Sequence, residues 1–430
     1  MKLPHPLEVE RLRAEHFGGV VQLRRPNGLL HVDRALLREL GVASSPLWVG
    51  PDDGAEASLD AQPLSAPTEV HVVLSRQCAA GCTGCYVDAT PQGAALPFEA
   101  ACRILDELAA MGVFHVALGG GEALELDYLF AVADHARAVG ITPNLTTSGL
   151  GLDARTAARC AVFGQINVSI DGVGEGYRRA RGFDGFAHAE RALVHLRAVK
   201  AEVGVNCVVS RSSFDGLGEV AALVKRLRLN ELELLRFKPV GRGARLDEEL
   251  TPAQGRKIYP LARWLMVRHR IRVKLDCSFA PMVFWHKPSA AAAAFLGVQG
   301  CVGGDVLAAV SPEGALMGCS FAGRAEADAR VPGAMQAAWK TGFGGFRDFV
   351  HAPPEPCASC DYLRLCRGGC RAVAQAHGPF AAPDPGCPRV QEYRAAHPGS
   401  GAPPATAAST QADPVSGPGH RRTSLPVVRG

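Results

Sequence analysis

Residues 70–86 read VHVVLSRQCAAGCTGCY, and this stretch decides the fold of the chain. A strand-like apolar run, Val70–Leu74, is followed directly by three cysteines, Cys78, Cys82 and Cys85. Three thiolates on one loop can ligate three irons of a [4Fe–4S] cluster and leave the fourth iron open, because thiolates are the usual ligands of such clusters. A zinc site is the alternative, although structural zinc normally takes two cysteine pairs or cysteine together with histidine.

From Thr68 onward, short apolar runs alternate with longer segments of helical spacing. The predicted strands are Val70–Leu74, Phe114–Leu118, Thr142–Leu145, Gln165–Ile170, Val203–Val209 and Glu231–Phe237. The predicted helices are Pro97–Met111, Leu126–Val139, Asp153–Phe163, Ala187–Val199, Leu217–Leu227 and Pro252–His269. This alternation indicates βαβ units and a parallel sheet. We therefore expect an α/β fold, a partial (β/α)6 barrel of the TIM type, with its chemistry at the carboxyl ends of the strands.

The predicted barrel spans residues 67–285 and is flanked by segments of different composition. Residues 1–66 are expected to form a small α+β unit, with two apolar stretches around Arg25-Pro26-Asn27-Gly28 as a hairpin signal, then a helix near Asp33–Leu40 and a linker. Residues 286–394 are rich in cysteine, glycine and proline, which suits a small domain held by metal. Residues 395–430 contain few bulky apolar side chains and are expected to be disordered.

The composition excludes several classes of protein. The 430 residues are 47% hydrophobic and 20% charged, and 46 basic against 42 acidic side chains give a net charge of +4. This near balance does not suggest a nucleic-acid-binding surface. The N-terminal sequence has no apolar core typical of a signal peptide, and no apolar run approaches the ~20 residues of a membrane span. We expect a cytoplasmic protein that binds neither nucleic acid nor membrane.

Fourteen cysteines are unusual for a cytoplasmic chain, where cysteines are more often metal ligands, catalytic groups or buried apolar side chains than disulfides. Cys102 and Cys160 lie in helical patterns and are expected to be buried packing residues, and His71 is expected to pack within its strand. Four cysteines stand alone, at Cys102, Cys160, Cys207 and Cys277, and seven more lie towards the C-terminus, at Cys301, Cys319, Cys357, Cys360, Cys366, Cys370 and Cys387.

Polar motifs follow three further predicted strands. Gly119–Glu122 reads GGGE after the second strand, Thr146–Gly149 reads TTSG at the end of the third, and Ser169–Gly172 reads SIDG at the end of the fourth. Arg181 follows twelve residues after Ser169. Each motif alone is compatible with an ordinary loop, but the carboxyl ends of parallel strands meet at one edge of the sheet.

The cysteine loop and these motifs, in this order, resemble the radical S-adenosylmethionine (SAM) superfamily. By resemblance, the glycine turn and Glu122 hold the methionine amino group, Ser169 contacts the ribose, and Arg181 pairs with the carboxylate of SAM. The family usually has an aromatic residue before the third cysteine, whereas this chain has Gly84 there and an aromatic side chain after it. The implied cofactor-binding residues are Tyr86, Gly120, Gly121, Glu122, Thr147, Ser148, Ser169, Asp171 and Arg181.

The resemblance implies reductive cleavage of SAM at the open iron of the cluster. One electron breaks the bond between sulfur and C5′ and releases a 5′-deoxyadenosyl radical, which abstracts hydrogen from a substrate. The cofactor carries this chemistry, and the protein supplies positioning and exclusion of water. A flavodoxin- or ferredoxin-like protein is the expected electron donor.

The C-terminal cysteines resemble the seven-cysteine pattern of SPASM domains, which carry auxiliary [4Fe–4S] clusters. The resemblance implies an outer cluster held by Cys357, Cys360, Cys366 and Cys387, and an inner cluster held by Cys301, Cys319 and Cys370. A zinc ribbon would leave several of these cysteines without a role. The fourth ligand of the inner cluster is left open between Cys277, Asp305 and an iron that is free to bind substrate.

Many SPASM enzymes modify ribosomally made peptides or proteins, and such a peptide or protein is the expected substrate. A radical SAM dehydrogenase acting on a small molecule, a sugar or cofactor precursor, is the alternative; a zinc-stabilised interaction protein is a third. Residues 1–66 either bind a leader peptide or cover the open side of the barrel. Basic residues within Leu234–Arg242 can meet SAM or an acidic substrate segment. Asp276 is the candidate catalytic base, and Cys277 either donates a hydrogen atom or ligates iron.

Overall fold

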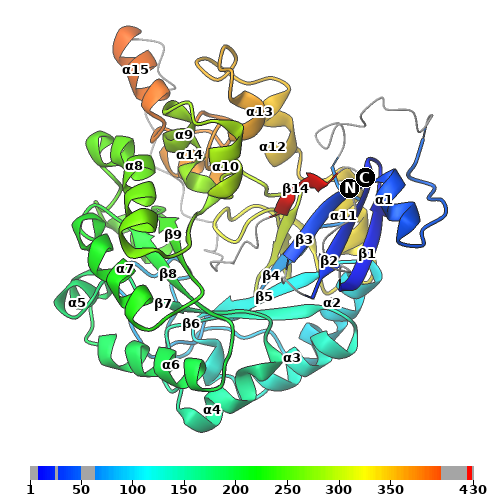
Figure 1. Cartoon of the computed structure of the whole chain (residues 1–430), viewed down its shortest axis with the longest axis horizontal. Coiled ribbons are helices and arrows are strands. Elements are labelled where there is room, and N and C mark those ends of the chain that lie inside the picture. The colour runs from blue at the N-terminus through cyan, green and yellow to red at the C-terminus, as the bar shows by residue number, and fades with distance from the viewer. Residues whose placement is uncertain (1–7, 25–27, 50–62, 399–423, 429–430) are drawn as a thin grey trace.

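The computed structural model describes residues 8–24, 28–49, 63–398 and 424–428. A curved ten-stranded sheet, in the order β10-β9-β8-β7-β6-β5-β4-β11-β12-β13, forms its centre (Figure 1). Six adjacent parallel strands make up most of it, β4 (Glu69–Ser75), β5 (His115–Gly120), β6 (Thr142–Thr147), β7 (Ile166–Ser169), β8 (Val203–Val209) and β9 (Glu231–Arg236). The predicted partial (β/α)6 barrel is therefore confirmed.

Helices cover the outer face of these strands (Figure 1). In the first of them, Ala101, Ile104, Leu105 and Leu108 recur at helical spacing and are all buried against the sheet. The short helix α5 is missed by the sequence analysis because Tyr177 is its only buried residue. The helices are α2 (Phe98–Ala110), α3 (Leu129–Ala138), α4 (Ala154–Arg159), α5 (Glu175–Arg181), α6 (Phe186–Ala198), α7 (Leu217–Arg226) and α8 (Pro252–His269).

The sheet continues beyond the six barrel strands at both ends, and the C-terminal segment supplies the strand beside β4. β10 (Val273–Leu275) pairs in parallel with β9, and β11 (Leu307–Val310) pairs in parallel with the outer edge of β4. An open edge of β4 would expose unpaired backbone groups, so this pairing stabilises both segments. The cysteine-rich segment therefore shares one sheet with the barrel. Its other elements are α9 (Ala280–Trp285), α10 (Ala290–Phe295), β12 (Ala315–Met317), β13 (Ala325–Asp328), α11 (Ala334–Thr341), α12 (Gly344–Arg347), α13 (Leu363–Cys366), α14 (Arg371–His377) and α15 (Pro388–Ala396).

The N-terminal unit is a second small sheet with one helix. The predicted hairpin is confirmed by the antiparallel pairing of β2 (Gly18–Leu23) with β3 (Gly28–Asp33), while its turn residues 25–27 lie outside the described residues, as does most of the predicted linker. β1 (Val9–Glu15) pairs with β2 and was not predicted, because its VERLRAE sequence is largely polar. The helix α1 (Arg34–Glu39) begins after the N-cap Asp33.

This unit packs against the amino-terminal ends of the barrel strands. Arg13 donates to the carbonyl oxygens of Ala66, Pro67 and Gly112 at 2.7–3.0 Å, and Gln22 donates to the hydroxyl of Thr142 at 3.0 Å. These contacts lie at the starts of β5 and β6. The unit therefore lies at the end of the strands opposite the cysteine loop, and the two expected roles of residues 1–66, leader binding or cover for the open side of the barrel, stay predictions.

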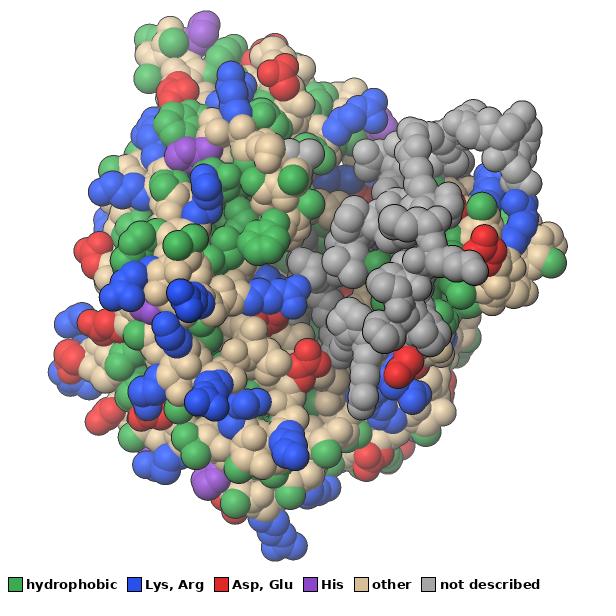
Figure 2. All heavy atoms as spheres, viewed as in Figure 1, with side chains coloured by type: hydrophobic (Ala, Val, Ile, Leu, Met, Phe, Trp, Pro, Cys, Tyr) green, Lys and Arg blue, Asp and Glu red, His purple; other side chains and the backbone are tan. Residues whose placement is uncertain are grey.

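The predicted disordered tail, residues 395–430, also needs a correction. Helix α15 continues to Ala396, and β14 (Ser424–Val428) pairs in parallel with β3, where its backbone fills an otherwise open sheet edge. Residues 399–423 and 429–430 lie outside the described residues. In the part of the chain that is described, no helix has the length and apolar content to cross a membrane. On the face in Figure 2, basic side chains are interspersed with acidic and apolar ones.

Candidate active site

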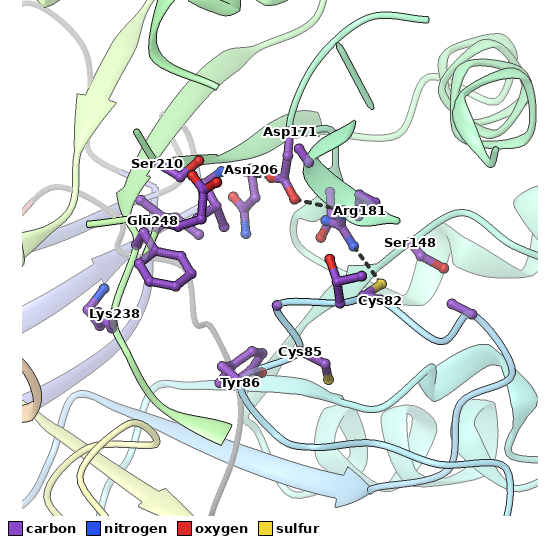
Figure 3. Close-up of a pocket in the computed structure, with 18 of the residues that line it drawn as sticks. Cys82, Cys85, Tyr86, Ser148, Asp171, Arg181, Asn206, Ser210, Lys238 and Glu248 are labelled. Atoms are coloured by element: carbon purple, nitrogen blue, oxygen red, sulfur yellow. Dashed lines mark hydrogen bonds and ion pairs between the residues drawn. The ribbon is translucent and has the colours of Figure 1, made fainter. Parts of the chain in front are cut away.

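A cavity of about 350 Å³ opens at the carboxyl ends of the barrel strands (Figure 3). This volume is within the range of small-molecule sites. Its walls contain all three cysteines of the first loop and all but one of the residues expected to bind SAM. Those lining residues are Cys78, Cys82, Cys85, Tyr86, Gly120, Gly121, Thr147, Ser148, Ser169, Asp171 and Arg181.

The glycine turn after β5 is pressed against the chain that leads into the cysteine loop. The Gly121 N–H donates to the Ser75 carbonyl at 2.6 Å, and the Glu122 N–H donates to the Gln77 carbonyl at 2.8 Å. A Cβ atom on Gly121 would lie 1.9 Å from that Gln77 oxygen, so no side chain fits there. The turn therefore fixes the start of the cysteine loop one residue before Cys78.

Glu122 is the one expected SAM-binding residue that does not line the cavity. Its buried carboxylate accepts hydrogen bonds from the Thr147 hydroxyl at 2.7 Å and the Ser148 N–H at 2.8 Å, and it also caps the turn at Leu124. Burial raises the pKa of Glu122 above its ordinary value. Through these hydrogen bonds the Glu122 carboxylate joins the β5 and β6 motifs, and its contact with SAM stays a prediction.

Arg181 lies between an acidic side chain and the cysteine loop (Figure 3). Its Nε is 2.6 Å from Oδ2 of Asp171, and its Nη1 is 3.7 Å from Sγ of Cys82. Burial alone would lower the pKa of Arg181, but the charges of Asp171 and Cys82 raise it well above its ordinary value. The backbone carbonyl of Arg181 also accepts the Thr83 N–H at 3.0 Å, which ties α5 to the loop.

Sequence reasoning missed most of the wall opposite the cysteine loop. Asn206 and Ser210 come from β8 and the turn after it, Lys238 follows β9, and Glu248 lies before α8 (Figure 3). Lys238 falls within the predicted basic stretch, which does reach the cavity. The strand-end argument, applied to β8 as it was to β5–β7, would have found Ser210, which directly follows that strand. Phe321 comes from the C-terminal segment, and nothing in the local sequence indicated its position.

Two aromatic rings close the cavity between the barrel and the C-terminal segment. The ring centroids of Tyr86 and Phe321 are 4.7 Å apart, and Nζ of Lys238 lies 4.4 Å from the centre of the Phe321 ring. The Tyr86 hydroxyl is buried without a hydrogen-bond partner, and burial raises its pKa well above the ordinary value. A buried donor of this kind fits a site that is completed by a polar ligand.

A second, smaller cavity lies behind this wall. It is lined by Asp276 and Cys277 together with three C-terminal cysteines, Cys301, Cys319 and Cys370, and Lys238 lines both cavities. Asp276 pairs with Lys238 at 2.6 Å, with its other oxygen accepting the Ser278 N–H at 3.1 Å. The structure therefore places the predicted base in the smaller cavity and engages its carboxylate with a lysine that faces the larger one.

The remaining C-terminal cysteines form a separate group. Burial, together with the neighbouring thiolates of Cys387 and Cys360, raises the pKa of Cys357 to about 12. Burial likewise raises the pKa of Cys366 well above its ordinary value, and the same three thiolates contribute. These electrostatic contacts show that the structure brings together the four cysteines expected to form the outer set.

The three loop cysteines are the donor set of the larger cavity. Among the described residues, no group of three or more His, Cys, Asp or Glu side chains is arranged to hold a single metal ion. In a [4Fe–4S] cluster, each thiolate binds a different iron. In the larger cavity, these three thiols and the glycine turn line the same space, and three thiols fit a cluster with one exposed iron.

Comparisons with known proteins agree with this site. A model of the Radical SAM superfamily matches residues 72–221. The chain is 32% identical to mycofactocin maturase MftC of Mycobacterium ulcerans over 346 residues, which cover 77% of this chain and 90% of that protein. It is 28% identical to the PqqA peptide cyclase of Ruegeria pomeroyi, covering 80% and 92% of the two chains. The crystal structure of Streptococcus suis SuiB bound to S-adenosylmethionine has a similar fold, with a TM-score of 0.70 at 16% identity over 89% of this chain and all of that one.

Proposed function

This chain belongs to the radical SAM superfamily, and we propose that it is an enzyme that modifies a side chain of a ribosomally made peptide or protein. The observation that carries the proposal is the meeting of three loop cysteines with the polar ends of β5–β9 around one cavity. The relatives named as a maturase and as a peptide cyclase, which align over most of their length, support the peptide substrate.

Cys78, Cys82 and Cys85 would hold a [4Fe–4S] cluster with one iron open to SAM. Burial raises the pKa of Cys78 to about 11, so assembly of the cluster would release protons from this loop. When bound, the cluster and SAM supply a 5′-deoxyadenosyl radical that abstracts hydrogen from the substrate. The remaining task of the protein is to bind and orient SAM and the substrate and to shield them from water.

The residues of the chain divide this task between the two walls of the cavity. On the wall of the cysteine loop, the glycine turn presents backbone to the methionine end of SAM, and Arg181 supplies a permanent positive charge for its carboxylate. Asp171 holds the Arg181 guanidinium in place through their 2.6 Å ion pair. Tyr86, backed by Phe321, gives an aromatic surface with one hydroxyl free to meet a ligand.

The opposite wall is left for the substrate. Asn206, Ser210, Lys238 and Glu248 offer donors, acceptors and both signs of charge across the cavity from Cys82 (Figure 3). Since Lys238 connects this cavity with Asp276, proton transfer from the substrate would pass through the ammonium group before it reached that carboxylate. Asp276 thus remains a proposed base only in concert with Lys238.

The two C-terminal cysteine groups would hold auxiliary [4Fe–4S] clusters, and a flavodoxin- or ferredoxin-like protein would supply the first electron. The outer group is Cys357, Cys360, Cys366 and Cys387, and the inner group includes Cys301, Cys319 and Cys370. Burial raises the pKa of Cys357 in the outer group and of Cys319 and Cys370 in the inner group, as expected for ligands that deprotonate only when metal binds.

The test uses the full chain, purified and reconstituted without oxygen, with SAM, dithionite and a candidate precursor peptide. If that peptide is expressed with deuterated amino acids, deuterium should appear in 5′-deoxyadenosine and the peptide mass should change. The variant C82A should form neither product, while C102A, which changes a cysteine on α2 away from the cavity, should behave like the wild type. Deoxyadenosine without deuterium would redirect the search to a small-molecule substrate, and deoxyadenosine from C82A would remove the site assignment.

A further inference from the structure

We propose that Cys277 is the fourth thiolate of the inner cluster, so that this cluster has no iron free to bind a substrate. The inference rests on the proposed function, because it presupposes that the C-terminal cysteines hold auxiliary clusters. It starts from the second cavity, of about 50 Å³, where Cys277, Cys301, Cys319 and Cys370 are the four lining cysteines. A complete set of four thiolates is the usual coordination of a [4Fe–4S] cluster.

Each of the four cysteines is held by a different part of the fold. Cys277 follows β10, Cys301 follows α10, Cys319 follows β12, and Cys370 precedes α14. A Cβ atom on Gly300 would lie 2.0 Å from the backbone oxygen of Cys366, so the chain before Cys301 packs directly on the segment that carries Cys370. Four separate segments therefore bring four thiols to one small cavity, which is the number of ligands that a [4Fe–4S] cluster takes.

The position of Cys277 is fixed by the end of the barrel sheet. The Asp276 N–H donates to the Leu234 carbonyl at 3.0 Å, which continues the pairing of β10 with β9. The carboxylate of Asp276 then accepts the Ser278 N–H at 3.1 Å and its hydroxyl at 2.5 Å, capping the short helix Cys277–Phe279. Cys277 is the first residue after this cap and lines the cavity with the other three thiols.

The positive charge of Lys238 lies close enough to interact with both Cys277 and the C-terminal thiols. The Lys238 ammonium, which is buried, interacts electrostatically with Cys370, Cys277 and Cys319. A cluster with four thiolates carries net negative charge, and one buried cation beside it offsets the cost of burying that charge. Lys238 also forms an ion pair with Asp276, the residue directly before Cys277.

The other candidate ligands are engaged with protein groups. Asp305 forms an ion pair with Arg367 and lies 3.9 Å from Arg347. His71 lines the cavity, but its Nδ1 is 3.2 Å from the Ser320 hydroxyl and its Nε2 is 3.3 Å from the Glu69 carboxylate. Neither residue offers the thiolate that iron in such a cluster prefers, whereas Cys277 does.

The experiment isolates the auxiliary clusters by replacing all three loop cysteines, in the variant C78A/C82A/C85A. Iron content and the electron paramagnetic resonance spectrum of the reduced, reconstituted protein are recorded with and without 2-mercaptoethanol, a small thiol that binds vacant iron. With Cys277 present, we expect about eight irons per chain, the content of two clusters, and a spectrum that the thiol does not change.

Adding C277A to this background should either remove about four irons, as C319A should, or produce a spectrum that 2-mercaptoethanol shifts. C277S keeps the size of the side chain and should give a changed spectrum without loss of fold. C102A is the matched control and should leave both readouts unchanged. The inference is overturned if the thiol shifts the spectrum while Cys277 is present, or if C277A matches C102A. Failure of the proposed function looks different, because zinc or no metal would then be found in the triple variant itself.

Discussion

Replacing Asp384 with alanine should loosen the C-terminal segment from the barrel far more than replacing an exposed aspartate. Arg236, at the end of β9, pairs with Asp384 through contacts of 2.7 and 3.2 Å, and both side chains are almost fully buried, at 3% and 0% exposure. The other donors to this carboxylate are the Cys370 N–H at 2.9 Å and the Gly386 N–H at 2.8 Å. The variant thus leaves a buried guanidinium with a single protein acceptor, the Ser278 carbonyl.

Breaking a buried ion pair by removing one partner costs about 3–5 kcal/mol. Since about 1.4 kcal/mol corresponds to a factor of ten, D384A should speed hydrogen exchange of the α14 amides by roughly 10²–10⁴-fold when exchange requires this segment to open. D328A is the matched control, because Asp328 pairs with Arg330 on the surface of β13. It should change exchange in α14 very little. Equal exchange in the two variants would refute the view that the Arg236–Asp384 pair joins the two segments.

Two further predictions concern the glycine turn and the N-terminal unit. G121A should weaken SAM binding, measured by titration, and lower the free energy of unfolding by about 1–3 kcal/mol, measured by calorimetry, because the added Cβ would meet the Gln77 carbonyl. The control G216A, where the space is open, should leave both quantities unchanged. Burial lowers the pKa of His31 to about 4, so the unfolded chain binds a proton below pH ~6.5 that the folded unit does not. The unfolding free energy of the unit should therefore fall by up to about 2–3 kcal/mol between pH 6.5 and 4, as measured by hydrogen exchange of the β2 amides. H31Q should flatten this pH dependence, and a pH dependence that H31Q leaves unchanged would contradict the role of His31.

The barrel was predictable because its signals are local. The helix Pro252–His269 was predicted with its observed bounds from its helical spacing, and in the structure a capping box of Thr251 and Gln254 begins it. The strands from β4 to β9 are short apolar runs, as buried parallel strands require. In contrast, β1 and α5 are largely polar, and their places depend on neighbours far along the chain.

The site was predictable where residues follow strands directly and was missed where side chains turn to other partners. Arg181 and Asp171 lie in the cavity as the strand-end pattern indicates. Glu122 comes from an equally clear motif, but its carboxylate is taken up by Thr147 and Ser148, a contact that spacing alone does not encode. Phe321 reaches Tyr86 only because β11 adds to the edge of β4 and brings the C-terminal segment to the mouth of the barrel.

The most direct test of the central claim is to measure iron, sulfide, zinc and 5′-deoxyadenosine for the full chain after anaerobic reconstitution with SAM and dithionite. Three clusters predict about twelve irons per chain with matching sulfide, together with release of 5′-deoxyadenosine. Zinc in place of iron, with no deoxyadenosine formed, would contradict the assignment of the chain as a radical SAM enzyme and would favour a zinc-stabilised interaction protein.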